Sequence, residues 1–509
     1  MINGVDDLLA QAGPEKVLQL FNDAPPAPEI QQTQAQMLIE LAAEAELLHT
    51  AQDEGYARVA VNGHHEIWIL RSKGFRQWLL REFYRTHGKP PGAQALQDAI
   101  GVLEAKARFE GREQSLAIRV AEHGGNIYFD LCNSRWGSVE ITPAGWTVIS
   151  DSPVNFRRSK GMLELPQPER GGTLELLRKH INVGDDSNWI LCASWLVASC
   201  WPKGPYPLLI LQGEQGSAKS SMERILRRVI DPSVAPVRTP PRDERDLLIA
   251  ANNSWVIAYD NLSGIPHWLS DALCRLATGG GFSTRELYSD SEEIFFHAQR
   301  PVILNGIDQL AERADLADRS IVLNLPRIAE TDRKDEAQLY VEFEQSLPKI
   351  LGALFDALSS ALARIGELRL ERKPRMADFA LRATAAEQAL GFGNGAFMER
   401  YAGNRAEAVQ ETLDADPVAS AIQSFLESID DTHWEGSCKE LLERLKPVAG
   451  EAVQKTREWP RSPRGLSSRL RRLVTFLREA GIEVTFPPRG TSGHRTVVIT
   501  KNGREFDRH

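Results

Sequence analysis

The stretch Pro207–Ile230, PLLILQGEQGSAKSSMERILRRVI, decides the fold. It predicts a buried strand over Leu208–Leu211, then a glycine-containing turn, then a helix. In this order, successive backbone N–H groups and a helix N-terminus point at one place, which suits the oxygens of a phosphate. Apolar strands alternate with helical patterns from Tyr206 to Ile328, so we predict an α/β protein with a parallel sheet and a phosphate-binding loop.

The loop itself, GEQGSAKS, supplies the residues that a nucleoside triphosphate requires. Lys219 would reach the β- and γ-phosphates, and the Ser220 hydroxyl would hold Mg²⁺. Ala218 stands where the usual pattern has glycine. Its methyl group is tolerated if the backbone angle is ordinary, with Gly216 supplying the remaining flexibility. The expected nucleotide contacts are Gly213, Glu214, Gln215, Gly216, Ser217, Ala218, Lys219, Ser220 and Ser221.

Three downstream segments extend this prediction. SWVIAYDNL ends a strand pattern at Asp260, which would hold Mg²⁺ through water, although a buried strand ending in a capping Asp gives the same pattern. PVILN ends at Asn305, which would face the γ-phosphate or would be an ordinary turn residue. ERADLADRS offers Arg313 and Arg319. Either arginine would stabilise transferred phosphoryl charge in a neighbouring subunit, or would be a solvated surface residue.

Four motifs, GEQGSAKS, VIAYDN, ATGGGFSTRELYSDSEEIFFHAQRPVILN and DLADRS, resemble the P-loop AAA+ motor of superfamily-III helicases of the phage and plasmid primase-helicase type. The likeness covers about residues 205–328, and more loosely 60–200. It implies a hexameric ring that binds ATP and Mg²⁺ between subunits and DNA, single-stranded or forked, in a central channel. It also implies a sensor role for Asn305, an arginine-finger role for Arg319 with Arg313 second, and a channel-facing hairpin before Asn305.

Two departures keep a second function open. Hydrolysing enzymes of this type carry a second acid where this chain has Asn261, which orients water but takes no proton. The expected hairpin tip, Ser289–Glu293, is acidic, although Arg285 at its base would compensate. The leading hypothesis is an ATP-dependent DNA helicase acting in replication of a phage or mobile element, beside a primase or other replication proteins. The alternative is an ATP-binding oligomeric switch that binds DNA and hydrolyses slowly.

The carboxyl-terminal end carries a second signal, because Lys455–His509 holds 13 Lys and Arg against 5 Asp and Glu in a chain of net charge −9. A helix over Leu466–Ala480 followed by strand patterns IEVTF and RTVVIT is typical of a winged helix. Its arginines would contact DNA, or would solvate an amphipathic helix. The candidate DNA contacts are Arg285, Arg464, Arg469, Arg471, Arg472, Arg489 and Arg495.

Composition limits the remaining choices. The 509 residues predict several domains, and the longest near-apolar run, Trp189–Trp201, is too short to cross a bilayer, so no membrane is expected. Five scattered cysteines without C-x-x-C predict reduced thiols and a cytoplasmic protein. The expected domains are a helical lead-in (1–55), a mixed α+β accessory domain (56–165), a helical collar (166–204), the P-loop core (205–330), a helical segment (331–414) and a winged helix (415–509).

Overall fold

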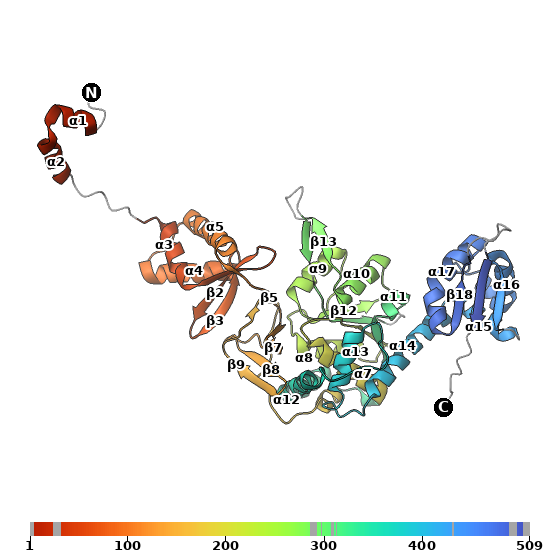
Figure 1. Cartoon of the computed structure of the whole chain (residues 1–509). Helices are drawn as coiled ribbons and strands as arrows, with labels where there is room; N and C mark the ends of the chain where they lie inside the picture. The colour runs from red at the N-terminus through yellow and green to blue at the C-terminus, as the bar shows by residue number, and fades with distance from the viewer. Residues whose placement is uncertain are drawn as a thin grey trace. The chain divides into compact units, whose positions relative to one another are not determined.

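A computed structural model describes residues 5–23, 32–285, 293–296, 298–306, 310–311, 313–429, 432–487 and 496–501. The chain forms two compact units (Figure 1). Unit 1 runs to Ser115 apart from residues 62–65, and unit 2 holds those four residues and the chain from Leu116 onward. The boundary between the units therefore falls inside the expected accessory domain 56–165.

Unit 1 is a small sheet covered by two long helices. The sheet has the order β3-β2-β1-β4, with β1 antiparallel to β2 and parallel to β4. The elements are α1 (Val5–Ala12), α2 (Pro14–Asn22), α3 (Gln34–Leu41), η1 (Ala42–Glu44), β1 (Glu46–His49), β2 (Gly55–Val61), β3 (His64–Ile69), α4 (Lys73–His87), α5 (Ala93–Phe109) and β4 (Arg112–Glu113). Residues 46–49 thus form a strand within the expected helical lead-in, because pairing with β2 places Leu48 in the core.

Unit 2 begins with an antiparallel meander in the order β6-β7-β8-β9. Its core face packs on α12, where the rings of Phe129 and Phe355 lie 5.2 Å apart, and Trp146 Nε1 donates to Asp356 Oδ1 over 2.9 Å. The elements before the parallel sheet are β5 (Leu116–Ala117), β6 (Val120–His123), β7 (Asn126–Asp130), β8 (Ser138–Thr142), β9 (Gly145–Ile149), β10 (Asn155–Phe156), α6 (Glu175–Arg178) and α7 (Asp186–Ser199).

The expected parallel sheet is confirmed and has the strand order β12-β15-β11-β16. Strands β11 and β15 are buried along their whole length, as in a sheet covered on both faces. An isolated parallel bridge adds Arg238 beside Tyr259 at the outer side of β12. The elements of this region are β11 (Leu208–Gln212), α8 (Lys219–Ile230), α9 (Glu244–Asn253), β12 (Ile257–Leu262), α10 (His267–Thr278), β13 (Phe282–Arg285), β14 (Glu293–Phe296), β15 (Val302–Gly306), α11 (Ala314–Ala317) and β16 (Ser320–Asn324).

A buried ion pair ties the meander to this sheet. Arg119 Nε donates to Asp231 Oδ1 over 3.1 Å, and both side chains are almost fully buried. Asp231 Oδ2 also accepts the backbone N–H groups of Trp255 and Val256, while Arg119 donates to the carbonyl oxygen of Asp130. Asp231 directly follows α8, so the far end of the helix that begins at the phosphate loop is fixed to the meander.

Helices follow the parallel sheet. The elements are η2 (Glu330–Asp332), α12 (Glu336–Arg364), α13 (Ala377–Ala386) and α14 (Ala396–Ala415). By length and composition, α12 alone among the described helices is apolar enough to cross a membrane. However, 61% of its most apolar window is buried inside the fold, as in the core helix of a globular domain.

The carboxyl-terminal region folds as a three-stranded antiparallel sheet with three helices. Its elements are α15 (Pro417–Ser428), β17 (His433–Ser437), α16 (Cys438–Gln454), α17 (Pro463–Glu479), β18 (Ile482–Thr485) and β19 (Thr496–Lys501). The strand order is β17-β19-β18. Helix α17 buries a stripe of apolar side chains, namely Leu466, Leu470, Leu473, Phe476 and Leu477.

Candidate functional site

The carboxyl ends of the parallel strands bring the predicted site residues together. Leu211 on β11 pairs with Asn305 on β15, and Tyr259 on β12 pairs with Leu304 on β15. Because parallel strands end at the same edge, the phosphate loop after β11, Asp260 and Asn305 meet there. The spacing of these motifs in the sequence therefore corresponds to one site in space.

The loop between β11 and α8 adopts a conformation that few side chains allow. Gly213 has φ 151°, and a Cβ there would lie 2.5 Å from the carbonyl oxygen of Leu325. Gly216 has φ 88°. Ala218 is left-handed, with φ 58° and ψ 31°, so it lacks the ordinary backbone angle at which a methyl group is tolerated without strain. A left-handed alanine costs about 1–2 kcal/mol relative to the right-handed conformation, which the surrounding loop must offset.

Lys219 lies over the loop with its ammonium group directed at the loop backbone. Its Nζ donates to the carbonyl oxygens of Gly213, over 2.7 Å, and Glu214, over 3.0 Å. Burial lowers the pKa of Lys219, and the charge of Asp260 partly opposes that shift. The lysine charge is thus held at the mouth of the loop, where a phosphate would bind.

Ser220 and Asp260 form the pair expected to hold a magnesium ion. Ser220 Oγ donates to Asp260 Oδ1 over 2.9 Å. Among the described residues no group of three or more His, Cys, Asp or Glu side chains has the arrangement of a metal cage. Magnesium does not need one, because it commonly keeps several waters and binds through one or two protein oxygens plus substrate phosphates. A hydroxyl and a carboxylate beside a phosphate loop fit that donor set.

Asn305 is buried and directed at protein groups. Its Oδ1 accepts the backbone N–H of Asn261 over 3.0 Å, and its Nδ2 donates to Glu223 Oε2. Asn261 is exposed and left-handed, with φ 58°. The structure therefore places Asn305 at the edge of the sheet that carries the phosphate loop, with its amide fixed by Asn261 and Glu223.

Glu223 is the site residue that the sequence analysis missed. It lies on α8 one turn after Lys219, is fully buried, and its Oε1 has no partner among the described atoms. Burial first, and then the charge of Asp260, raise the pKa of Glu223 to about 8. The sequence signal available for it was a glutamate one turn after the loop lysine, preceded by Met222.

Neither candidate arginine finger is free within its own chain. Arg313 pairs with Asp271 over 2.8 Å and donates to the carbonyl oxygen of His267. Arg319 pairs with Asp315 and is largely buried. A role for either in a neighbouring subunit stays a prediction that would require exchanging these partners.

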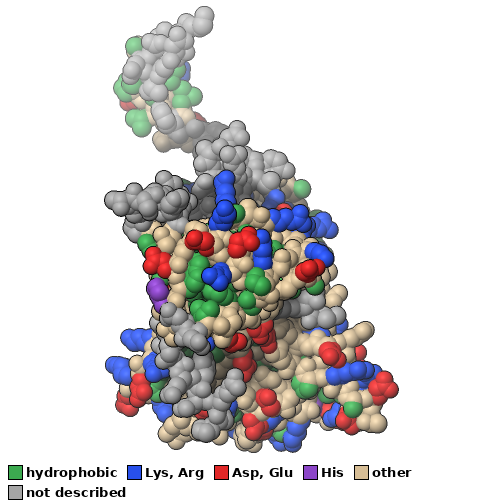
Figure 2. All heavy atoms as spheres, turned by 90° about the vertical axis from the view of Figure 1, so that its right-hand side faces the viewer, with side chains coloured by type: hydrophobic (Ala, Val, Ile, Leu, Met, Phe, Trp, Pro, Cys, Tyr) green, Lys and Arg blue, Asp and Glu red, His purple; other side chains and the backbone are tan. Residues whose placement is uncertain are grey.

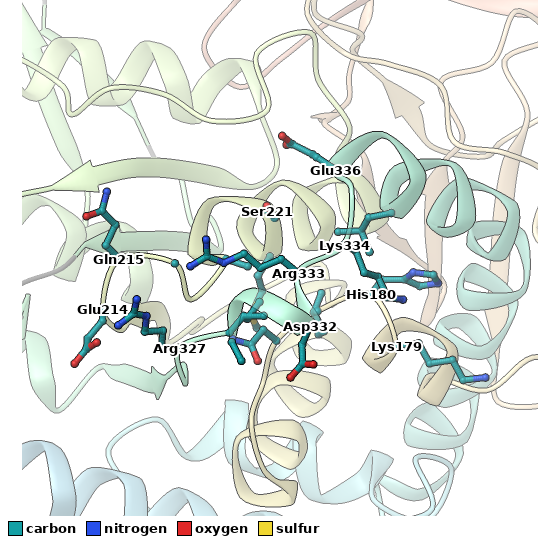
Figure 3. A pocket seen from close by; sticks show the side chains of 18 residues that line it. Lys179, His180, Glu214, Gln215, Ser221, Arg327, Asp332, Arg333, Lys334 and Glu336 are labelled. Atoms are coloured by element: carbon teal, nitrogen blue, oxygen red, sulfur yellow. The ribbon is translucent and has the colours of Figure 1, made fainter.

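A cavity of about 1060 Å³ opens directly over the loop. Figure 3 shows Arg327 and Arg333 on the side where Glu214 and Gln215 lie, and Lys179, His180 and Lys334 on the other. Asn182, which also lines the cavity, connects the loop to the segment after β16, because its Nδ2 donates to the carbonyl oxygens of Ser217 and Pro326. The sequence analysis predicted the linings that come from the loop, but not those at residues 179–182 and 327–339, which carry no motif.

The candidate DNA contacts divide into three groups. Arg469 is half-buried and paired within the protein, since its guanidinium donates to Asp416 Oδ2 over 2.8 Å. Arg471 is exposed but lies over the ring of Phe486 at 4.1 Å, whereas Arg464 and Arg472 are exposed with no ion pair to a described residue. Arg489 and Arg495 lie outside the described residues, as do the side chain of Arg285 and the acidic tip at residues 289–292.

The face of the carboxyl-terminal region in Figure 2 mixes Lys and Arg with Asp, Glu and a small group of hydrophobic side chains. It is therefore not a continuous basic field.

The implied hairpin is present in the backbone, where β13 pairs antiparallel with β14 and extends beyond α9 and α10 (Figure 1). All five cysteines are free thiols.

Comparison with known proteins identifies two regions. Residues 174–402 match the family described as actinomycete integrative conjugative element replication protein, and residues 418–506 match the AICE RepA C-terminal domain. No curated protein matches the chain. Among solved structures, the A form apo structure of the NrS-1 C-terminal region (305–718) aligns with TM-score 0.40 and 11% identity, covering 91% of this chain and 99% of that one. A second A form apo structure of that region gives TM-score 0.41 and 12% identity, over 93% and 100% of the two chains.

Proposed function

Starting from the matches of residues 174–402 and 418–506 to the two parts of a mobile-element replication protein, we propose that this chain is an ATP-hydrolysing DNA motor of that replication system. The single observation that carries the proposal is the meeting of the loop lysine, Ser220 and Asp260 at one edge of a parallel sheet. The proposed fold of residues 205–330 is a P-loop AAA+ core. The strand order, with the loop strand between β15 and β16, supports it.

In the proposed mechanism the loop N–H groups and Lys219 bind the phosphates. An incoming γ-phosphate replaces the two carbonyl oxygens that now accept from Lys219 Nζ. Ser220 and Asp260 would hold a magnesium ion, and that ion would supply positive charge to neutralise the phosphates. The cavity beside the loop would take the nucleoside part, with Asn182 maintaining the loop against the segment after β16.

Water activation falls to the group around Asn305. Asn261 is exposed at the carboxyl edge and would orient water, while the backbone N–H of Asn261 fixes the amide of Asn305. Glu223 holds the other end of that amide. This network positions Asn305 without supplying an exposed general base, which favours the second candidate, an ATP-binding oligomeric switch with slow hydrolysis.

The carboxyl-terminal region is proposed to be a winged helix that binds DNA. Its element order, α15-β17-α16-α17-β18-β19, places one helix directly before a two-stranded wing, which supports that fold. Arg464 and Arg472 on α17 are the exposed side chains best placed for phosphates. The proposal also includes assembly into a ring, a partner primase and a cytoplasmic location.

ATP hydrolysis by the full chain, with and without single-stranded and duplex DNA, tests the motor. The wild type is compared with Lys219→Ala, and with Lys373→Ala as a control that removes an exposed lysine outside the cavity. DNA-stimulated turnover that is lost only in Lys219→Ala supports the motor, and strand displacement is then measured. Tight ATP binding and oligomer formation without turnover would select the switch, and no nucleotide binding would reject both.

A further inference from the structure

Unit 1 carries a basic segment that the proposed function does not use. Between Arg71 and Lys89 the sequence has six Lys and Arg and one acid, Glu82, in a chain whose net charge is −9. Most of this segment is α4. We define the α4 surface as Lys73, Arg76, Arg81, Tyr84, Arg85 and Lys89.

The packing of α4 directs this surface to solvent. Phe75, Leu79 and Phe83 are fully buried in the core of unit 1 and recur every four residues, so they occupy one side of the helix. All six members of the α4 surface are exposed. The five members within α4 span about 18 Å, at a rise of about 1.5 Å per residue.

Only part of this charge is balanced inside the unit. Arg81 and Arg85 share the carboxylate of Glu82, with Arg81 contributing 2.9 and 3.0 Å contacts and Arg85 a longer one of 3.5 Å. Within the described part of the chain, no carboxylate lies at ion-pair distance from Lys73, Arg76 or Lys89. Three cations are therefore available for an external anion.

Tyr84 lies among these cations and is 59% exposed. An exposed aromatic ring flanked by cations matches the way proteins hold single-stranded nucleic acid, since bases stack on the ring while Lys and Arg contact the phosphates. A duplex offers no free base face to such a ring. A bilayer is a poorer match, because an interfacial helix inserts its apolar side and the apolar side of α4 is already in the core.

We infer that the α4 surface is a binding site for single-stranded DNA, separate from the loop site and from the carboxyl-terminal helix. The inference goes beyond the proposed function, because it requires neither ATP nor α17. It gives unit 1 a task, holding an exposed strand by its backbone and by one stacked base.

The test measures binding of labelled oligothymidylate to the full chain by fluorescence anisotropy over a salt series, without nucleotide. All proteins also carry Arg464→Ala and Arg472→Ala, so that DNA binding by helix α17 does not contribute to the measured slope. Lys73→Ala with Arg76→Ala should lower the log–log salt slope by about 1.4, at about 0.7 per phosphate contact. Tyr84→Ala should weaken binding about tenfold, whereas Tyr84→Phe should retain it.

A matched control removes two arginines from the same unit that already have partners. Arg108 pairs with Asp53 over 2.7 Å and Arg112 pairs with Glu46, so replacing both by alanine should leave the slope unchanged. An unchanged slope in the Lys73 and Arg76 variant, with a wild-type melting curve, would overturn the inference. So would equal binding of duplex with no effect of Tyr84→Ala, or variant-sensitive binding of phosphatidylglycerol vesicles instead of oligonucleotide. Loss of ATP hydrolysis alone would bear on the proposed function and not on this site.

Discussion

The phosphate loop and helix α17 both have clear sequence signals, yet the predicted residues lie together at the loop and have different surroundings on α17. At the loop, Lys219, Ser220 and Asp260 lie where their spacing predicts, because strand ends and a helix N-terminus fix backbone positions. On α17, arginines of identical chemistry separate into three that contact Asp416, Phe486 or Glu483 and two, Arg464 and Arg472, that have no ion pair to a described residue. Motif spacing therefore predicts which residues lie together, whereas charge content does not predict which arginines of a helix are already paired within the chain.

The largest expected effect comes from removing the loop charge. Lys219→Ala should reduce ATP turnover by about 10²–10³-fold, because a preorganised cation is lost where phosphoryl charge develops. Steady-state hydrolysis measures this effect, with circular dichroism as the folding control. Turnover within a factor of three of wild type would mean that Lys219 takes no part in ATP hydrolysis. Motif spacing at the loop would then be no better a guide to function than charge content on α17.

The second prediction concerns the pH dependence of stability. The pKa of Glu223 is raised to about 8 in the folded chain, above its value near 4.5 when unfolded, so the folded state binds the extra proton between these values. Stability contributed by this group is complete below pH about 4.5 and is lost as pH rises toward 8, by at most about 1.4 kcal/mol per pH unit. The free energy of unfolding, measured by urea melts at several pH values, should not show this fall in Glu223→Gln. The same pH dependence in the variant and the wild type would contradict the prediction.

A third comparison sharpens the division among the arginines of α17. Arg469→Ala should lower the free energy of unfolding by about 1 kcal/mol, because it breaks a partly exposed pair with Asp416, and should leave the salt slope of duplex binding unchanged. Arg464→Ala with Arg472→Ala should do the reverse, lowering the slope by about 1.8 while stability stays the same. Thermal melting and salt-dependent anisotropy of both variants test this prediction. If both variants changed stability and salt slope in the same way, the distinction between paired and unpaired arginines would be wrong.

The smallest effect is expected at Ala218. Glycine removes the left-handed penalty of about 1–2 kcal/mol but adds about 0.5–1 kcal/mol of backbone entropy to the unfolded chain. Ala218→Gly should therefore stabilise the protein by about 0.5 kcal/mol, measured by thermal melting. A destabilised variant would mean that the alanine methyl group makes compensating contacts.

The sequence predicted the parallel sheet and the meeting of Ser220 with Asp260 at its edge because both depend on backbone order. It could not predict which way the Asn305 amide turns, since that depends on Asn261 and Glu223, which come from other elements. Glu223 was missed because a glutamate on a helix normally faces water. The cavity linings outside the loop, at residues 179–182 and 327–339, were missed because those residues acquire a role only by proximity to the loop.

The buried carboxylate of Asp231 has a consequence for genetics. Its two oxygens accept hydrogen bonds from Arg119, Trp255 and Val256. In Asp231→Asn the NH₂ group would replace one of these accepting oxygens and would face N–H groups that are themselves donors. Alleles at this position would leave every residue of the loop in place while weakening the join between the meander and the sheet. Screens for temperature-sensitive replication should therefore recover changes at Arg119 and Asp231, whereas alleles of Lys219 should be defective at every temperature.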